Sequence, residues 1–188
     1  MKNICLCIAI TVFFCASIAL AENISIQQTA TLTVPRDKTA RHSDEDRRCF
    51  SFEQGIAKSS RERDWDLGYG LLLINGEEWF QVPAGNDKRS VIKDIGELNW
   101  SDSLSLPALR PLPELKDGEV RNITVDSSAD THKNWKETNG IFAKAQVGHM
   151  YLVRIKDEDS DFYALFRVES KGEYDCAITW KLIPSPEK

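Results

Sequence analysis

The chain has 188 residues, of which 41% are hydrophobic and 28% charged, and its formal net charge is −5. This length suits one domain with a hydrophobic core, and the composition is that of a folded protein and not of a disordered one. The acidic balance argues against nucleic acid as a partner, because binding to phosphate groups requires a cationic surface.

Residues 1–21 have the pattern of an export signal. Lys2 supplies the positive start, an apolar run follows, and Ala19-Leu20-Ala21 is an A-x-A cleavage site. The apolar run is too short, and wrongly flanked, for a stable membrane span. We therefore expect a cleaved signal peptide and a secreted or periplasmic location. We also expect no transmembrane segment in the mature protein, and a single β-rich domain over residues 22–188.

Export changes the expected state of the cysteines. Cleavage would remove Cys5, Cys7 and Cys15 and leave Cys49 and Cys176. Because two thiols in an oxidising compartment most often pair, we expect a Cys49–Cys176 disulfide, with two separate buried thiols as the alternative. In the chain-entropy model, a bridge across so long a loop would stabilise the fold by roughly 4–5 kcal/mol, less any strain.

The first elements of the domain are predicted to be strands. Apolar and polar residues alternate from Ile24 to Val34, and Pro35 ends the run. Residues 36–48 are almost entirely charged or polar, with both signs mixed, which predicts a solvated connector. Residues 49–53 then form a short predicted strand whose two phenylalanines share one face.

The clearest strand pattern of the chain runs from Trp65 to Ile74. Asn75-Gly76 follows, the pair that a type I′ turn prefers, and Glu78 to Val82 is the predicted partner strand. Gly68 and Gly70 share one strand face and leave a flat notch. A tryptophan of the core, a ligand or another backbone could cover this notch.

The middle of the chain has weaker signals. Apolar residues at helical spacing predict a short helix over residues 90–98. Three prolines within residues 101–118 forbid regular helix and interior strand, so we expect an ordered surface crossing there, with a flexible one as the alternative. Residues 120–125 have a strand pattern, and residues 126–140 are polar, with Trp135 as their only large apolar side chain.

The C-terminal fifth of the chain is predicted to be a β-meander of three strands, over residues 150–155, 162–168 and 176–183. An acidic run forms its first turn and Gly172 helps to form the second. The predicted fold class is therefore all-β: an antiparallel sandwich or open barrel with at most one or two short helices.

The acidic turn was compared with known metal-binding patterns. Asp157, Asp159 and Asp161 match the first half of an EF-hand loop, but Phe162 takes the required glycine position and Val168 the required glutamate. A different calcium geometry and a solvated hairpin turn are the two remaining interpretations. The chain has neither the HExxH nor the CxxC pattern of zinc sites.

No sequence motif identifies a catalytic residue. The chain has no G-x-S-x-G, although a hydrolase can use two carboxylates that are distant in sequence and close in space. A secreted hydrolase with such a carboxylate pair is therefore one alternative. A carbohydrate-binding domain that stacks tryptophans on sugar rings is another.

Three side chains are candidate ligands for a metal or haem iron, because imidazole and thioether groups bind such ions: His132, His149 and Met150. An exposed histidine without a function is the alternative for each of the two histidines.

Two regions of the chain resemble HmuY-like exported proteins. Cys49-Phe-Ser-Phe-Glu-Gln-Gly, followed by Asp64-Trp-Asp-Leu, is similar to the opening of those proteins, and the stretch from Gly148 to Trp180 is similar to their closing meander. The resemblance implies an all-β domain outside the cytoplasm that binds haem through paired histidines or methionines. The implied function is that of a non-catalytic exported protein for a small-molecule or surface ligand, with haem as the most concrete ligand.

Overall fold

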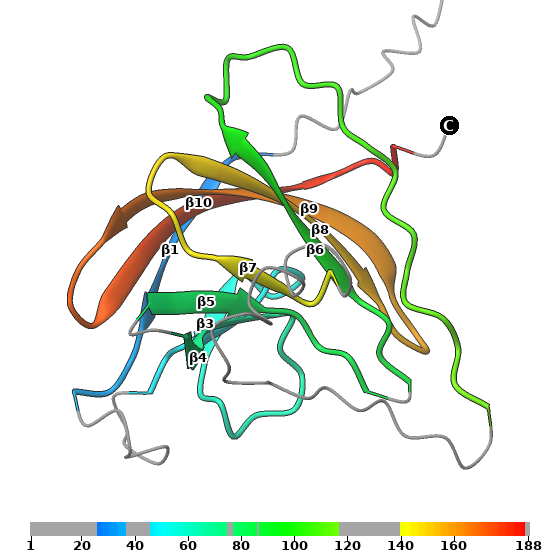
Figure 1. The fold of residues 1–188 in the computed structure, drawn as a ribbon, viewed down its shortest axis with the longest axis horizontal. Coiled ribbons are helices and arrows are strands. Elements are labelled where there is room, and N and C mark those ends of the chain that lie inside the picture. Colours follow the sequence, from blue (N-terminus) through cyan, green and yellow to red (C-terminus); the bar gives the residue numbers. More distant parts are fainter. Residues whose placement is uncertain (1–25, 37–45, 75–76, 86, 117–139, 187–188) are drawn as a thin grey trace, which may run out of the picture.

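The computed structural model describes residues 26–36, 46–74, 77–85, 87–116 and 140–186. These residues form ten strands and no helix, and the strands build two antiparallel sheets that pack face to face without closing into a barrel (Figure 1). The predicted all-β fold is confirmed in its sandwich form.

The first sheet, called sheet I, contains the predicted C-terminal meander. Its five strands pair in the order β1 (Gln28–Thr33), β10 (Asp175–Ile183), β9 (Asp161–Lys171), β8 (His149–Lys156) and β6 (Val91–Glu97). Strands β8, β9 and β10 follow one another in the chain and pair antiparallel, as predicted. Strand β1 joins the edge of this sheet along β10, so the first and last strands of the domain are neighbours.

The second sheet, called sheet II, contains the predicted central hairpin. Its strands pair in the order β3 (Ile56–Lys58), β2 (Cys49–Ser51), β4 (Leu67–Ile74), β5 (Glu77–Gln81) and β7 (Phe142–Lys144). The pairing of β4 with β5 is confirmed, whereas the turn residues 75–76 lie outside the described residues. Strands β3 and β7 were not predicted, because three residues are too few for an alternating pattern to be recognised.

Aromatic rings from both sheets fill the space between them. The ring of Phe166, in sheet I, lies 5.0 Å from that of Phe80 and 6.1 Å from that of Phe52, both of which belong to or follow strands of sheet II. It also stacks on Tyr151 with a centroid distance of 4.8 Å. Phe50 and Phe52 both contact Trp180, which confirms that they share the inward face. Burial of these rings is the main force that holds the two sheets together.

A second apolar cluster, which we call the outer cluster, lies on the outer face of sheet I. Residues 98–112, which we call the strap, run across this face after β6 and cover it (Figure 1). The carbonyl of Leu109 accepts hydrogen bonds from Arg154 Nη1 at 2.8 Å and from the Tyr163 hydroxyl at 3.2 Å. The predicted ordered crossing is therefore confirmed for the described part of residues 101–118.

The predicted helix over residues 90–98 is wrong, because residues 91–97 form β6. Val91 packs in the outer cluster under the strap, and Ile92 packs in the core between the sheets. A strand that is buried on both faces carries neighbouring apolar residues, and this pattern imitates helical spacing.

The predicted solvated connector over residues 36–48 is wrong at its end. Asp46 and Arg48 are 0% and 4% exposed, and the guanidinium Nε of Arg48 lies 2.9 Å from the Asp46 carboxylate. Arg47 forms an isolated bridge with Thr33 at the end of β1. The charges are buried because they pair with each other and with the serines after β3, which the local composition does not reveal.

Several sequence predictions lie outside the described residues: the signal peptide over residues 1–21, the strand over residues 120–125, and most of the polar stretch over residues 126–140. Within the part of the chain that the structure describes, no helix is long and apolar enough to cross a membrane.

Candidate functional site

The two candidate iron ligands among the described residues, His149 and Met150, do not converge. His149 and Met150 are neighbours in β8 and therefore point to opposite faces of sheet I. Met150 is fully buried in the outer cluster, while His149 is 26% exposed and lies at the inner face. His132 lies outside the described residues. A haem site with both His149 and Met150 as axial ligands therefore does not fit this fold.

His149 does have the support that a single metal ligand needs. Its Nδ1 lies 3.0 Å from both carboxylate oxygens of Asp94, and 3.3 Å from the side-chain amide of Gln146. Because an ionised carboxylate only accepts hydrogen bonds, Nδ1 carries the proton toward Asp94, which orients the ring. However, the described residues contain no group of three or more side chains placed to hold a metal ion.

The acidic turn uses its carboxylates within the turn itself. Asp157 Oδ1 accepts hydrogen bonds from the backbone amides of Asp159 at 3.1 Å and of Ser160 at 2.7 Å. Asp161 pairs with Arg154 at 2.9 Å, and this hydrogen bond holds the pKa of its carboxyl below the usual value. Because two of the three candidate calcium ligands are engaged in this way, the arrangement is that of a capped hairpin turn.

The predicted Cys49–Cys176 disulfide is wrong for this structure: both residues are buried free thiols. Phe50 faces the core, so its neighbour Cys49 points to the outer face of sheet II. Cys176 points from β10 into the core of the sandwich. The two sulfur atoms therefore lie on different layers, and burial raises the pKa of each thiol to about 12.

The four tryptophans within the described residues do not form the row that a sugar platform requires. Trp79 and Trp180 are 5% and 3% exposed. Trp65 and Trp100 are partly exposed but line two different sites. Trp135 lies outside the described residues.

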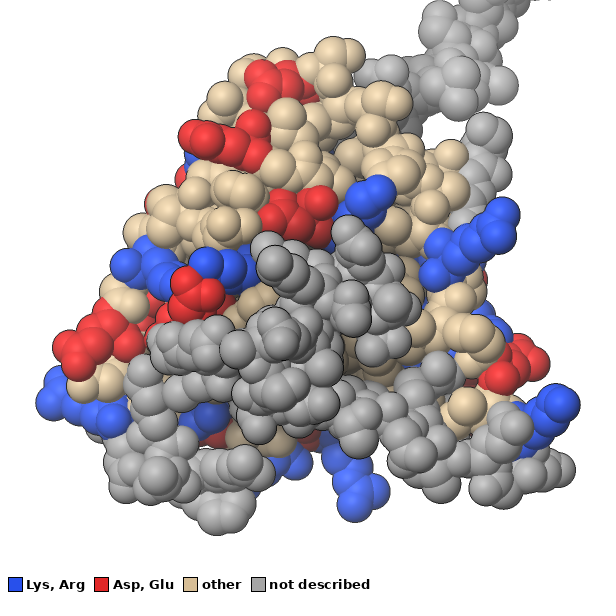
Figure 2. Space-filling view, in the orientation of Figure 1, with Lys and Arg blue, Asp and Glu red and all other residues tan. Residues whose placement is uncertain are grey.

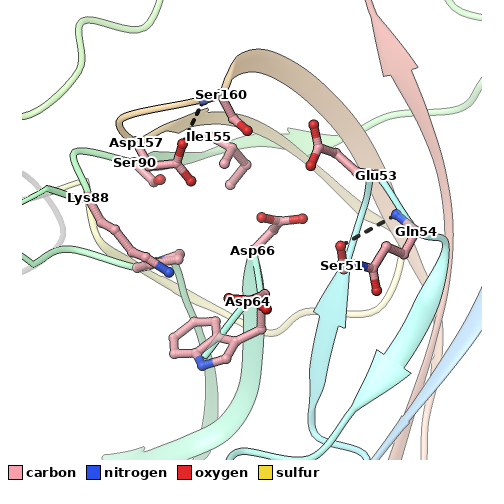
Figure 3. Close-up of a pocket in the computed structure, with 12 residues that line it drawn as sticks. Ser51, Glu53, Gln54, Asp64, Asp66, Lys88, Ser90, Ile155, Asp157 and Ser160 are labelled. Carbon is pink, nitrogen blue, oxygen red and sulfur yellow. Dashed lines mark hydrogen bonds between the residues drawn. The ribbon is translucent and has the colours of Figure 1, made fainter. Parts of the chain in front are cut away.

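The first of these two sites is a polar cleft at one end of the sandwich, about 90 Å³ in volume (Figure 3). It lies between the turn after β2, the segment before β4, the segment before β6 and the turn between β8 and β9. Asp66 lies in its middle, with the carboxyl groups of Glu53 and Asp157 on either side. Asp64 and Lys88 complete its charged lining. This volume is that of a few water molecules.

Asp66 is the chemically unusual group of the cleft. Burial raises the pKa of its carboxyl to about 6, and the nearby Glu53 and Asp157 carboxylates add to the rise. Hydrogen bonds from the Phe52 amide, at 2.8 Å, and from Ser51 act in the opposite direction but do not cancel the effect of burial. Asp66 is therefore able to release or take up a proton near pH 6. The other carboxyl groups of the cleft are those of Glu53, Asp64 and Asp157.

The second site is a groove of about 490 Å³ between the strap and the outer face of sheet I. By residue type its lining is mostly apolar: Trp100, Leu104, Leu106, Leu165, Ile183, Pro184 and Pro186. Polar atoms nevertheless contribute slightly more of its surface than apolar atoms do. Two charged residues, Asp102 and Lys181, also line it. Its size lies within the range of small-molecule binding sites in proteins.

Trp100 is fixed to the floor of this groove by hydrogen bonds. Its indole Nε1 donates to Thr179 Oγ1 at 2.9 Å, and Thr179 in turn donates to Glu169. Arg167 pairs with the same Glu169 and donates to the carbonyl of Leu98 at 2.9 Å. The start of the strap is thus bound to β9 and β10, so the groove is present before any ligand binds.

The groove was not predicted, although the apolar residues of the strap indicate that this segment packs against another surface. The strap carries several apolar side chains among its prolines: Leu98, Trp100, Leu104, Leu106, Leu109 and Leu112. A segment that forms neither helix nor strand and yet carries so many apolar residues has to pack against another surface.

No protein-family model, no curated protein and no solved structure matches this chain. The resemblance to HmuY-like proteins therefore stays a prediction.

Proposed function

We propose that this chain is a non-catalytic exported protein that binds an apolar small molecule in the groove under the strap. The observation that supports the proposal is the groove itself: an open groove of about 490 Å³, lined mostly by apolar residue types, with a tryptophan fixed in it by a hydrogen bond. Small-molecule sites in proteins have volumes in this range and are lined mainly by hydrophobic and aromatic side chains. The cleft around Asp66 is lined mostly by charged and polar residues and therefore does not suit an apolar ligand.

The test uses Nile red, a neutral apolar fluorophore whose emission rises in apolar surroundings. We expect saturable binding to the purified chain, and we expect Leu104→Gln to weaken it because this change places an amide in the groove wall. Leu182→Gln is the matched control, since Leu182 is 37% exposed and does not line the groove. Binding that is absent, or that both variants weaken equally, would overturn the proposal.

Haem is the ligand to which the HmuY-like resemblance points, and it can be tested in the same way. The groove lining contains neither histidine nor methionine. If a porphyrin binds there, haemin and metal-free protoporphyrin should therefore bind about equally, and Leu104→Gln should weaken both. A sharp Soret band that His149→Ala removes would instead place haem at the His149–Asp94 pair and contradict the assignment to the groove.

The cleft supports a second candidate function, a hydrolase that uses a carboxylate pair. The specific observation is Asp66, whose raised pKa keeps a proton available near pH 6 beside the carboxylates of Glu53 and Asp157. A protonated carboxyl next to an ionised one is the arrangement by which glycosidases donate a proton to the leaving group.

A panel of chromogenic glycosides, assayed between pH 4 and pH 7, tests this second candidate. We expect turnover that falls above pH 6 and is lost in Asp66→Asn. Asp64→Asn, which changes an exposed carboxylate of the same cleft, should leave turnover intact. The absence of turnover in the unmodified chain would exclude glycoside hydrolysis by this cleft.

A further inference from the structure

Lys181 is the cation of the groove, and its position is well defined. It lies in β10 two residues after Thr179 and therefore on the same outer face of sheet I. Its ammonium group lies over the ring of Trp100, with Nζ 5.2 Å from the ring centroid. A cation–π contact of this kind holds the ammonium at the apolar wall of the groove.

The two neighbouring carboxylates hydrogen-bond to groups other than Lys181, although Asp102 keeps its charge because its partner is a neutral amide. Glu169 uses one carboxylate oxygen for Thr179 and the other for Arg167. Asp102 accepts a hydrogen bond from the backbone amide of Asn99 at 2.7 Å, and its own amide donates back to the carbonyl of Asn99. Among the described residues, Lys181 consequently forms no ion pair, whereas other lysines of sheet I, such as Lys156 and Lys171, do.

From this arrangement we infer that the groove selects an amphipathic anion: a ligand with an apolar body and one carboxylate, which pairs with Lys181. The apolar body contacts Leu104, Leu106 and Ile183, while the carboxylate reaches the ammonium at the Trp100 end. The inference rests on the proposed function, since it names the class of ligand that the groove would bind.

The test is a competition against Nile red by three ligands that share one alkyl chain and differ in charge: dodecanoate, dodecanol and dodecyltrimethylammonium, each below its micelle-forming concentration. We expect dodecanoate to displace Nile red at about a fivefold lower concentration than dodecanol, the size of a partly exposed ion pair. We expect dodecyltrimethylammonium to be the weakest competitor. Lys181→Met should remove the advantage of dodecanoate and leave dodecanol unchanged.

Two further variants complete the design. Lys181→Glu should reverse the order, so that dodecyltrimethylammonium competes better than dodecanoate. Lys93→Met removes an exposed lysine of β6 that does not line the groove, and it should change nothing. If Nile red binds and the three ligands compete equally, or if Lys181→Met leaves their order unchanged, the inference is overturned while the proposed function stands. If Nile red does not bind at all, the proposed function fails as well.

Discussion

At the scale of single residues, Asp66 shows how the fold changes the chemistry of a side chain. Its two hydrogen-bond donors, the Phe52 amide and the Ser51 side chain, are both neutral, and the charged groups that act on it most, Glu53 and Asp157, are acidic. A carboxylate that is partly buried without a cationic partner costs stability. Residues of this kind in a cleft are candidates for function.

The first prediction follows from the pKa of Asp66, which is 3.8 in its usual state and about 6 in the folded chain. Between these values the folded state binds more protons than the unfolded state, so the free energy of unfolding falls as the pH rises through this window. Asp66→Asn should therefore stabilise the chain by on the order of 2 kcal/mol at pH 7. Below pH 3.8 the gain should vanish.

Urea unfolding of both proteins at pH 3.5, 5 and 7 measures this effect. Asp64→Asn is the control, because Asp64 is an exposed residue of the same cleft. A difference between Asp66→Asn and the unmodified chain that does not change with pH would show that the carboxyl is not held out of its usual titration range.

The second prediction concerns Cys49 and Cys176, which are both fully buried. Because their pKa values are raised to about 12, almost no thiolate is present near neutral pH. We expect iodoacetamide to modify neither cysteine in the folded chain and both in guanidinium without reductant. Mass spectrometry of the two cysteine peptides measures this result. Modification that occurs only after reduction would instead show a disulfide.

At the scale of elements, irregular positions in β4 and β6 shape the sheets. Gly70 has a φ of 61° near a shift in the pairing of β4 with β5, and Gly96 has a φ of 95° at a shift in the pairing of β6 with β8. Residues other than glycine rarely adopt such backbone angles. The surroundings differ, because a Cβ atom at Gly70 would lie 2.8 Å from Val34 Cγ2, whereas one at Gly96 would meet nothing within 4 Å.

The third prediction compares Gly70→Ala with Gly96→Ala. Both changes should cost about 1 kcal/mol through the backbone angle alone. Gly70→Ala should cost clearly more, because the new methyl group would displace Val34 from the core. Thermal unfolding of the two variants side by side is the measurement, and equal losses would contradict the close contact with Val34. This contact also identifies the group that covers the notch at Gly70: it is Val34, which is neither a tryptophan nor a ligand.

The elements themselves could be predicted well where the local pattern is strong. The β8–β9–β10 meander and the β4–β5 hairpin were found. Strand β10 alternates, whereas β8 and β9 are buried on both faces and show continuous apolar runs between turn residues. Strand β6 is also buried on both faces, but its few apolar residues stand among charged ones at a spacing that imitates a helix, and it was missed. The strap was predicted to be ordered, but its contacts with Tyr163 and Leu165 join residues that are far apart in the chain.

At the scale of the whole molecule, sheet I separates two apolar layers that differ in how much of the fold they hold together. The layer between the sheets contains the aromatic cluster around Phe166. The layer between the strap and sheet I contains Leu109 of the strap. The first layer joins both sheets, whereas the second joins one segment to one sheet. The two layers should therefore respond differently to the loss of a side chain.

The fourth prediction tests this difference. Phe166→Ala should lower the free energy of unfolding by about 3–5 kcal/mol and weaken hydrogen-exchange protection in both sheets. Leu109→Ala should lower it by about 2–3 kcal/mol and weaken protection mainly in the strap and β6. Hydrogen exchange followed by mass spectrometry resolves the segments. Uniform loss of protection in both variants would show that the two layers unfold as one unit.

The fold class and most strand positions follow from the sequence alone, because the apolar runs and the alternation of apolar and polar residues that mark strands are local properties of each segment. The tertiary structure alone decided which strands share a sheet and which layer each side chain enters. It separated Cys49 from Cys176 and His149 from Met150, gathered carboxylates around Asp66, and placed Lys181 beside Trp100. These juxtapositions depend on how distant segments pack and pair, and no short stretch of the chain encodes them.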